Sequence, residues 1–318
     1  MYIVVFYYHV EPCSAYEREG QSDWATSGGP VSHTRRRAPM TDPLPTVARL
    51  AVYPIKALDP LVLEEATVVP TGSLEYDREF AIVDGDGEYV HGKRTPAAHR
   101  VRADYDFGPD RRRVRLRERG RSMGQWFDLL ADRDDAEGWL SDFFDLSTEL
   151  VRRTDGGYPD LTGYPSGPTV ISTGTLREVA SWYPGMTTEE ARLRFRANIE
   201  IEGVPPFWED RLYTGTDEEI RFDVGDVTVA GVQPTPRCAV PLRDPHTGEE
   251  TEGFRSTFLS KREETYPEWG DEDAFQHYFH LMVNTHVPDS AVGKTLAVGD
   301  EVRLHDDNPV PRRVEQES

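Results

Sequence analysis

The sequence predicts a β-rich α+β protein, in which a small N-terminal β-barrel precedes a second β-barrel with short helices. Two turn sequences between apolar runs, Asp84-Gly-Asp-Gly87 and Phe107-Gly-Pro-Asp110, predict hairpins in the first part. Helical patterns are few and short, whereas strand-forming runs recur along the chain. The length of 318 residues suggests about two domains.

The first barrel is predicted within residues 40–155. Its expected strands are residues 46–55, 63–70, 80–83, 88–91, 101–106 and 113–117. A helix is expected at residues 132–146, where Trp139, Leu140, Phe143 and Phe144 make an apolar face.

The second domain is predicted within residues 156–306, after a Gly-, Pro- and Tyr-rich loop at 156–168. Its expected strands are residues 169–172, 193–202, 221–232, 276–283 and 296–304. Helices are expected at 175–182 and 254–264, and a capping box at 187–190 opens another. The polar tail at 307–318 is expected to be disordered.

Residues 1–39 differ from the rest in charge. They carry four acids and four bases, so the whole net charge of -21 belongs to residues 40–318. We expect this segment to be disordered or a mis-assigned extension, with the native start at Met40. Residues 1–8 are apolar but too short to span a membrane, and they lack a signal-peptide pattern. A cytoplasmic protein is expected.

The composition is acidic and poor in lysine. Of 36 basic residues, all but Lys56, Lys93, Lys261 and Lys294 are arginine. Such a surface disfavours nucleic acid and anionic membranes as partners. It is what a protein dissolved in concentrated salt would carry, since salt screens self-repulsion. A halophilic prokaryote is the expected source; an ordinary acidic protein is the alternative.

Cysteine is scarce, which limits the possible chemistry. Cys13 and Cys238 make neither a disulfide framework nor a set of ligands for a zinc or iron–sulfur site. Cys238 follows Arg237, and a neighbouring guanidinium favours the thiolate, a good ligand for soft metals. The alternative is an inert core residue, since free cysteine is among the most buried residue types.

An ordered set of motifs surrounds Cys238. It comprises Arg196-Ala197-Asn198-Ile199, Glu209-Asp210, Val224-Gly225-Asp226, Arg237-Cys238 and Asp244-Pro-His-Thr-Gly248. This run resembles the MOSC domain of molybdenum cofactor sulfurases and amidoxime-reducing enzymes. Upstream, Val52-Tyr53-Pro54-Ile55-Lys56 and Glu75-Tyr76-Asp77-Arg78-Glu79-Phe80 resemble the β-barrel domain that precedes MOSC in the amidoxime-reducing branch. The resemblance covers roughly residues 46–305.

The resemblance implies a site for the molybdenum cofactor (Mo-molybdopterin), a pterin with a dithiolene and a phosphate. Cys238 would be the catalytic residue and metal ligand. The cofactor-binding residues would be Lys56, Arg78, Ser172, Arg196, Asn198 and Arg237. Guanidinium and ammonium groups suit the phosphate, and Asn and Ser suit the pterin edge. Surface ion pairs are the alternative for the bases, and a helix cap is the alternative for Ser172.

The resemblance also implies an activity. It is the reduction of N-hydroxylated small molecules, with electrons from a separate donor protein such as a ferredoxin or a flavin reductase. An acidic protein could dock an acidic ferredoxin only in high salt or through a local arginine patch. The alternative function is a carrier of the molybdenum cofactor or of persulfide sulfur without turnover. Cofactor sulfurases carry an additional pyridoxal-phosphate domain, for which this sequence has no length.

Overall fold

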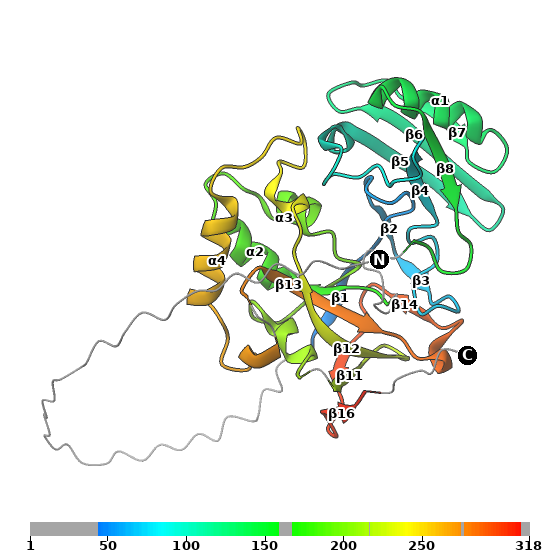
Figure 1. Ribbon diagram of the computed structural model, residues 1–318. Coiled ribbons are helices and arrows are strands. Elements are labelled where there is room, and N and C mark those ends of the chain that lie inside the picture. Colours follow the sequence, from blue (N-terminus) through cyan, green and yellow to red (C-terminus); the bar gives the residue numbers. More distant parts are fainter. Residues whose placement is uncertain (1–43, 159–166, 216, 275–276, 313–318) are drawn as a thin grey trace, which may run out of the picture. The chain divides into compact units, whose positions relative to one another are not determined.

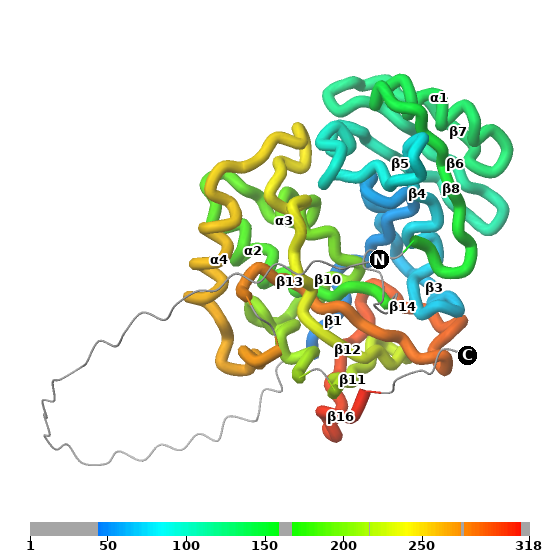
Figure 2. The backbone as a smooth tube through the Cα atoms, viewed as in Figure 1, coloured from blue at the N-terminus to red at the C-terminus, as the bar shows by residue number. Residues whose placement is uncertain are grey.

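The computed structural model describes residues 44–158, 167–215, 217–274 and 277–312. The predictions for residues 1–39, and part of those for the 156–168 loop and the tail, lie outside these ranges. Strands and short helices alternate through the described chain (Figures 1 and 2), so the predicted β-rich α+β class is confirmed.

The strands are β1 (Thr46–Val52), β2 (Leu61–Leu63), β3 (Glu65–Thr67), β4 (Phe80–Asp84), β5 (Val101–Gly108), β6 (Arg111–Glu118), β7 (Gln125–Asp128), β8 (Thr148–Arg152), β9 (Val170–Ser172), β10 (Ile199–Glu202), β11 (Glu218–Val224), β12 (Val227–Pro236), β13 (His280–His286), β14 (Thr295–Ala297), β15 (Val302–Leu304) and β16 (Val310–Pro311). The α-helices are α1 (Arg133–Phe144), α2 (Thr173–Ser181), α3 (Thr188–Phe195) and α4 (Phe254–Glu264). Short 3₁₀ helices include η1 (Pro96–Arg100) and η2 (Trp208–Leu212).

A nine-stranded mixed sheet organises what we call the second lobe, which also contains α2, α3 and α4. Its order is β15-β11-β12-β13-β9-β10-β1-β2, with β16 paired to β11. The β9–β10 pair is parallel, and the other pairs are antiparallel. Strand β1 is early in the chain, yet it pairs with β10 in this sheet. The sheet therefore crosses the predicted domain boundary at 155/156.

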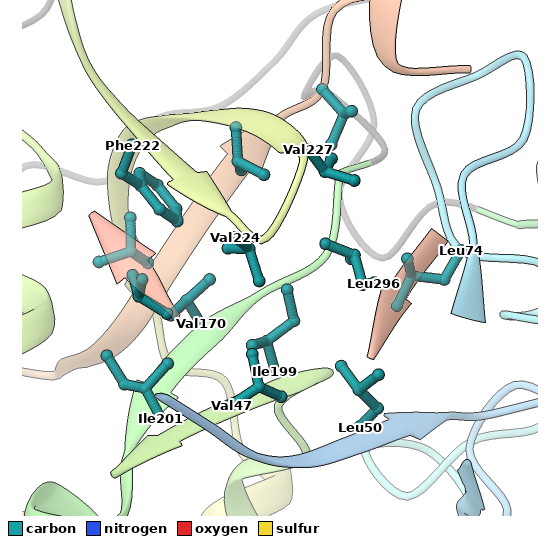
Figure 3. Packing of buried hydrophobic residues seen from close by; sticks show 14 of the residues in the cluster. Val47, Leu50, Leu74, Val170, Ile199, Ile201, Phe222, Val224, Val227 and Leu296 are labelled. Carbon is teal, nitrogen blue, oxygen red and sulfur yellow. The ribbon is translucent and has the colours of Figure 1, made fainter. Parts of the chain in front are cut away.

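The core of this sheet joins residues distant in sequence. Val47 and Leu50 of β1 pack with Val170, Ile199 and the β11–β12 hairpin (Figure 3). Leu296 of β14 lies in the same cluster, and β14 pairs with β3. A separate cluster, centred on Phe195, Phe254 and Phe258, holds α2, α3 and α4 against the sheet.

The first lobe is built from β4–β8 and α1. It contains the pairs β4–β8 and β5–β6–β7 around a core that includes Phe80, Val114, Leu116 and Leu140. The β5–β6 hairpin and α1 lie where the sequence predicts them. Residues 88–91 are different: the turn after β4 forms, but only the single bridge Val83–Tyr89 follows it, and β4 takes β8 as its partner.

Two further expectations for the second lobe need correction. Residues 193–195 are the last turn of α3, not the start of a strand, and β10 begins only at Ile199. Residues 296–304 are two short strands rather than one. In the described ranges, no helix is both long and apolar enough to cross a membrane.

Candidate functional site

A cavity of about 390 Å³ is lined by both lobes. The first lobe and the segment leading into it contribute Tyr53, Lys56, Ala57, Leu58, Asp59, Arg78, Tyr89, His91, Gly92, Lys93, Ala98, His99, Val101, Gly156 and Tyr158. The second lobe contributes Gly167, Thr169, Leu193, Phe195, Arg196, Thr235, Pro236, Arg237, Cys238, Val240, Pro245, Met282 and Asn284. This volume falls in the usual range of small-molecule and cofactor sites.

The lining is cationic although the protein is acidic. Five of its residues are basic, namely Lys56, Arg78, Lys93, Arg196 and Arg237, and two of them are among the four lysines of the chain. Among the described lining residues, Asp59 is the one acid. Its Oδ2 lies 2.8 Å from Arg102 Nε and accepts from the Ala103 N–H at 3.0 Å. The cavity therefore favours an anionic ligand.

Backbone strain gathers at the same cavity. Seven non-glycine residues of the described chain have positive φ, and four of them line it: Ala57, Arg78, Arg196 and Met282. Side chains with a Cβ rarely adopt this conformation, and such strain clusters at functional sites. Met282 has φ 64° inside strand β13. The surrounding structure therefore holds these four lining residues in backbone conformations that their residue types rarely adopt.

Arg196 is positioned by the end of helix α3. It is the C-cap residue in left-handed conformation, with φ 60°. Its guanidinium donates to Leu58 O at 2.7 Å and lies 4.0 Å from the centre of the Tyr53 ring. The Tyr53 hydroxyl donates to Ala197 O at 3.3 Å. These contacts connect the segment entering the first lobe to α3.

Arg78 lies two residues before β4, and Lys56 lies between β1 and β2. Arg78, with φ 53°, lies 2.7 Å from Asp77 Oδ2, and Asp77 Oδ1 accepts from the Tyr53 N–H at 2.8 Å. Lys56 Nζ lies 4.5 Å above the Tyr89 ring. Tyr89 contacts Tyr158 edge to face, with 5.9 Å between ring centres. An aromatic flank thus borders the lysine.

Lys93 and Arg94 are neighbouring bases that follow the turn after β4. Lys93 lines the cavity, whereas Arg94 pairs with Asp84 on the exposed turn at 2.9 Å. Lys93, and not Arg94, is therefore the candidate for contact with a ligand in the cavity.

Cys238 lies two residues beyond the end of β12 and is half-buried in the lining. The backbone N–H of Arg237 donates to Phe279 O at 2.9 Å, and its guanidinium donates to Phe195 O at 3.2 Å. Arg237 is thereby anchored to both β13 and α3. Since Arg196 and Cys238 line one cavity, the thiol and the cations can act on a single ligand.

Ser172 and Asn198 do not line the cavity, so the expectation that they contact a cofactor needs correction. Ser172 is fully buried as the N-cap of α2, where its Oγ accepts from the Thr175 N–H at 3.0 Å. Asn198 is buried, with Oδ1 accepting from the Thr169 N–H at 3.1 Å and Nδ2 donating to Ala51 O at 3.0 Å. Their polar atoms hold β1, β9 and α2 together.

Two lining residues that the motifs did not identify carry buried polar atoms. Both Asn284 Nδ2 and His99 Nε2 are buried, and the described residues supply no hydrogen-bond partner for Asn284 Nδ2. Asn284 is only 9% exposed, and its Oδ1 accepts from Thr235 Oγ1 at 2.8 Å. Burial, then the charges of Arg196 and Arg243, lower the pKa of His99 to about 4. The place of Thr235 three residues before Cys238 was the one available signal in the sequence.

The other motif residues have structural contacts. Glu209 and Asp210 lie buried in η2, outside the cavity lining, and Asp210 pairs with the fully buried Arg262. Asp244 Oδ1 accepts from the N–H groups of His246 and Thr247, which closes the turn that brings Pro245 into the lining. His246 itself is not in the lining.

Among the described lining residues, Cys238 is the one thiol that could bind a metal. Nowhere in the described ranges do three or more His, Cys, Asp or Glu side chains gather as a metal site. A metal at Cys238 would therefore have to bring its other ligands with it.

In a comparison with known protein families, residues 44–127 match the family model of the MOSC N-terminal beta barrel domain. The match supports the resemblance read from Tyr53, Lys56 and Arg78, which lie within it.

Two curated proteins are similar to the chain. One is a molybdenum cofactor sulfurase of Caenorhabditis briggsae, 24% identical over 224 residues, covering 65% of this chain and 30% of that protein. The other is a molybdenum cofactor sulfurase of Caenorhabditis elegans, 27% identical over 131 residues, covering 41% of this chain and 16% of that protein. The chain spans less than a third of the length of either relative. The amidoxime-reducing branch and the halophilic source stay predictions.

Proposed function

We propose that the cavity binds a molybdenum cofactor and that the protein reduces N-hydroxylated compounds with electrons from a partner protein. The observation that carries the proposal is one thiol facing the same cavity as five cations, in a chain of net charge -21. The matched N-terminal domain and the molybdenum cofactor sulfurase relatives support it.

The lining residues fit this cofactor in three respects. Cys238 offers a soft thiolate to a metal that already carries sulfur ligands. Lys56, Arg78, Arg196 and Arg237 suit a phosphate, with arginine able to bind it through two N–H groups. Asn284 Nδ2 needs an acceptor that the described residues do not supply, and a ligand oxygen would provide one.

When bound, the cofactor supplies the two-electron oxygen-atom transfer chemistry. In the reaction, the N–O bond of an N-hydroxylated substrate breaks, and the oxygen leaves as water with two protons and two electrons. Burial holds the pKa of both His91 and His99 below its ordinary value, so neutral imidazoles line the cavity. Their N–H groups can donate to the substrate oxygen. Tyr89 and Tyr158 offer aromatic surface to the substrate and exclude water.

The electrons must come from another protein in this scheme. The chain has two cysteines, fewer than an iron–sulfur cluster of the usual four-cysteine type needs. A ferredoxin or a flavin reductase is the proposed class of donor.

The test is made on one preparation purified in high salt. Elemental analysis, pterin fluorescence and turnover of an amidoxime with an artificial electron donor are measured together. The proposal requires metal and pterin in near-equal amounts and turnover in proportion to them. Protein that takes up no pterin from a cofactor-producing host would overturn it.

A carrier of the cofactor or of persulfide sulfur is the second candidate. The observation that favours it is that both curated relatives are molybdenum cofactor sulfurases. In that case Cys238 would hold sulfur or cofactor in transit. Cofactor-loaded protein without turnover, or intact protein heavier by one sulfur atom at Cys238, would favour the carrier.

A further inference from the structure

The outward face of the sheet β5-β6-β7 is rich in arginine. In β6, Val114 and Leu116 point into the first lobe with no exposed surface, so the alternating residues point outward. These are Arg111, Arg113, Arg115 and Arg117, and in β7 Trp126 lies opposite Arg115. We call these five residues the arginine face; Figure 1 shows the three strands that carry it and its border.

This face is positive in an acidic protein. Residues 100–121 contain nine arginines and four acids, whereas the whole chain has a net charge of -21. Two of the nine do not belong to the face, because Arg112 is buried against Glu79 and Arg102 lies against Asp59. Three acids on the face and its border are each shared by two arginines: Asp104 by Arg115 and Arg117, Asp106 by Arg111 and Arg113, and Glu118 by Arg100 and Arg121. Asp128 lies opposite Arg113 on β7 as a fourth acid. Six arginines therefore meet four acids, and the group keeps a net positive charge.

Trp126 is exposed at the centre of these charges. It keeps 41% of its surface accessible, and the guanidinium carbons of Arg113 and Arg115 lie 5.3 and 5.6 Å from its ring centre. Stacking against the ring holds the two arginines in place. Tryptophan and arginine are the residues that most often dominate the energy of protein interfaces.

We propose that the arginine face is the docking surface for an acidic protein partner. Its carboxylates would pair with the arginines while its apolar surface covers Trp126. That this partner is the electron donor rests on the proposed function. A nucleic acid fits less well, because a phosphate at every step would meet Asp104 and Asp106 as well as the -21 of the whole chain. A protein can leave the positions opposite those acids uncharged.

The test measures binding of the full chain to an immobilised acidic [2Fe–2S] ferredoxin across a salt series, with a single-stranded oligonucleotide as the second probe. The face variant is Arg113→Glu/Arg115→Glu. The matched control is Arg211→Glu/Arg303→Glu, which makes the same charge change at two exposed arginines elsewhere. Arg211 also lies over an exposed tryptophan, 4.4 Å from the Trp269 ring centre. The control thus tests whether any arginine beside tryptophan suffices.

Wild type and control are expected to bind the ferredoxin with equal affinity. The affinity of the face variant is expected to be lower by about tenfold or more. Equal binding by face variant and control, no binding by wild type, or binding of the oligonucleotide alone would each overturn the proposal. Should the Glu variant fail to unfold cooperatively in urea, Arg113→Gln/Arg115→Gln replaces it, with a smaller expected loss.

Turnover measurements test separately whether the docked partner is the electron donor. With an artificial donor the face variant should turn over amidoxime as wild type does, and with reduced ferredoxin it should be slower by the loss in binding. No turnover with either donor would contradict the proposed function and leave the binding result to decide the docking surface.

Discussion

Arginine is used differently in the interior of the protein and in the cavity. In the interior, basic side chains meet carboxylates: Arg112 lies 2.7 Å from Glu79, Arg192 lies 2.7 Å from Glu200, and Arg262 pairs with Asp210. In the cavity lining, five cations accompany Asp59, the one acid among the described lining residues, and Arg78 also pairs with Asp77 just outside the lining. Arg196 there is held by a carbonyl and a tyrosine ring.

The difference separates structural charge from charge available to a ligand. A buried charge is stable only when it is paired, so each interior arginine and its carboxylate partner neutralise each other. Carbonyls and aromatic rings orient a guanidinium without neutralising it. The charge of Arg196 therefore stays available to a ligand, and changes at the two kinds of site should have different consequences.

The largest effect is expected at the thiol of the cavity. Cys238→Ser is nearly isosteric, but a hydroxyl is a harder and poorer ligand than a thiolate. We expect turnover with an artificial donor to fall by about a hundredfold or more, with the free energy of unfolding changed by roughly 1–2 kcal/mol at most. Turnover per folded molecule is the measurement. Undiminished turnover would remove Cys238 from the chemistry and the proposed function with it.

The next effect tests the interior. Arg262→Met leaves Asp210 buried without its guanidinium, which should lower the free energy of unfolding by about 3–5 kcal/mol. Arg196→Met in the cavity should cost about 1 kcal/mol or less but weaken cofactor retention. Urea unfolding and pterin content are measured for both. If Arg196→Met were the more destabilising change, the contrast between structural and ligand-directed arginines would fail.

Adding Asp210→Asn to Arg262→Met provides the control. The amide that replaces the carboxylate is uncharged, so the double variant no longer buries an unpaired charge. Part of the lost free energy of unfolding should therefore return. No recovery would mean that the arginine acts through packing against Phe207, whose ring centre lies 4.3 Å from its guanidinium.

Glu209 provides a smaller effect through pH. Burial, then the charge of Asp210, raises its pKa to about 7 from an ordinary value of 4.5. Between these values the folded protein keeps the proton and the unfolded chain loses it. Stability therefore falls as pH rises from 4.5 to 7 and levels off above 7, by up to roughly 3 kcal/mol.

The control for this prediction is Glu209→Gln, which cannot ionise. His99 contributes with the opposite sign, because its lowered pKa makes stability rise with pH between about 4 and 6.5. The measured quantity is thus the difference in unfolding free energy between wild type and Glu209→Gln. A difference that does not change over this pH range would contradict the assignment.

Sequence patterns predicted local structure better than pairing. The turn Phe107-Gly-Pro-Asp110 between two strand-forming runs was enough for the β5–β6 hairpin, because both strands and their turn are adjacent in the chain. Nothing local indicates that Leu50 pairs with Ile199, since the two strands are far apart in sequence. The left-handed end of α3 at Arg196 was also missed, and a strand was expected there.

The site residues divide in the same way. Lys56, Arg78, Arg196, Arg237 and Cys238 were proposed from motifs, and all line the cavity. Ser172 and Asn198 belong to the same motifs but are buried, because small polar residues beside strand ends cap helices and bridge strands as readily as they bind ligands. Asn284 lies in no motif, and only the pairing of β12 with β13, which sets it opposite Gln233, brings it within hydrogen-bonding reach of Thr235.

The smallest expected effect concerns Thr235 and Asn284. It separates a role of Asn284 in ligand binding from a role in stability. Thr235→Val/Asn284→Leu replaces both partners with apolar groups of similar size. Removing a buried donor that lacks an acceptor should leave unfolding free energy unchanged or raise it by about 1–2 kcal/mol. If Asn284 Nδ2 serves a ligand oxygen, pterin retention or KM should worsen by about tenfold, as expected for one hydrogen bond to a charged group. Thr235→Val alone is the control, because it leaves the amide in place. A less stable double variant with full pterin content and unchanged KM would show that Asn284 supports the sheet and not the ligand.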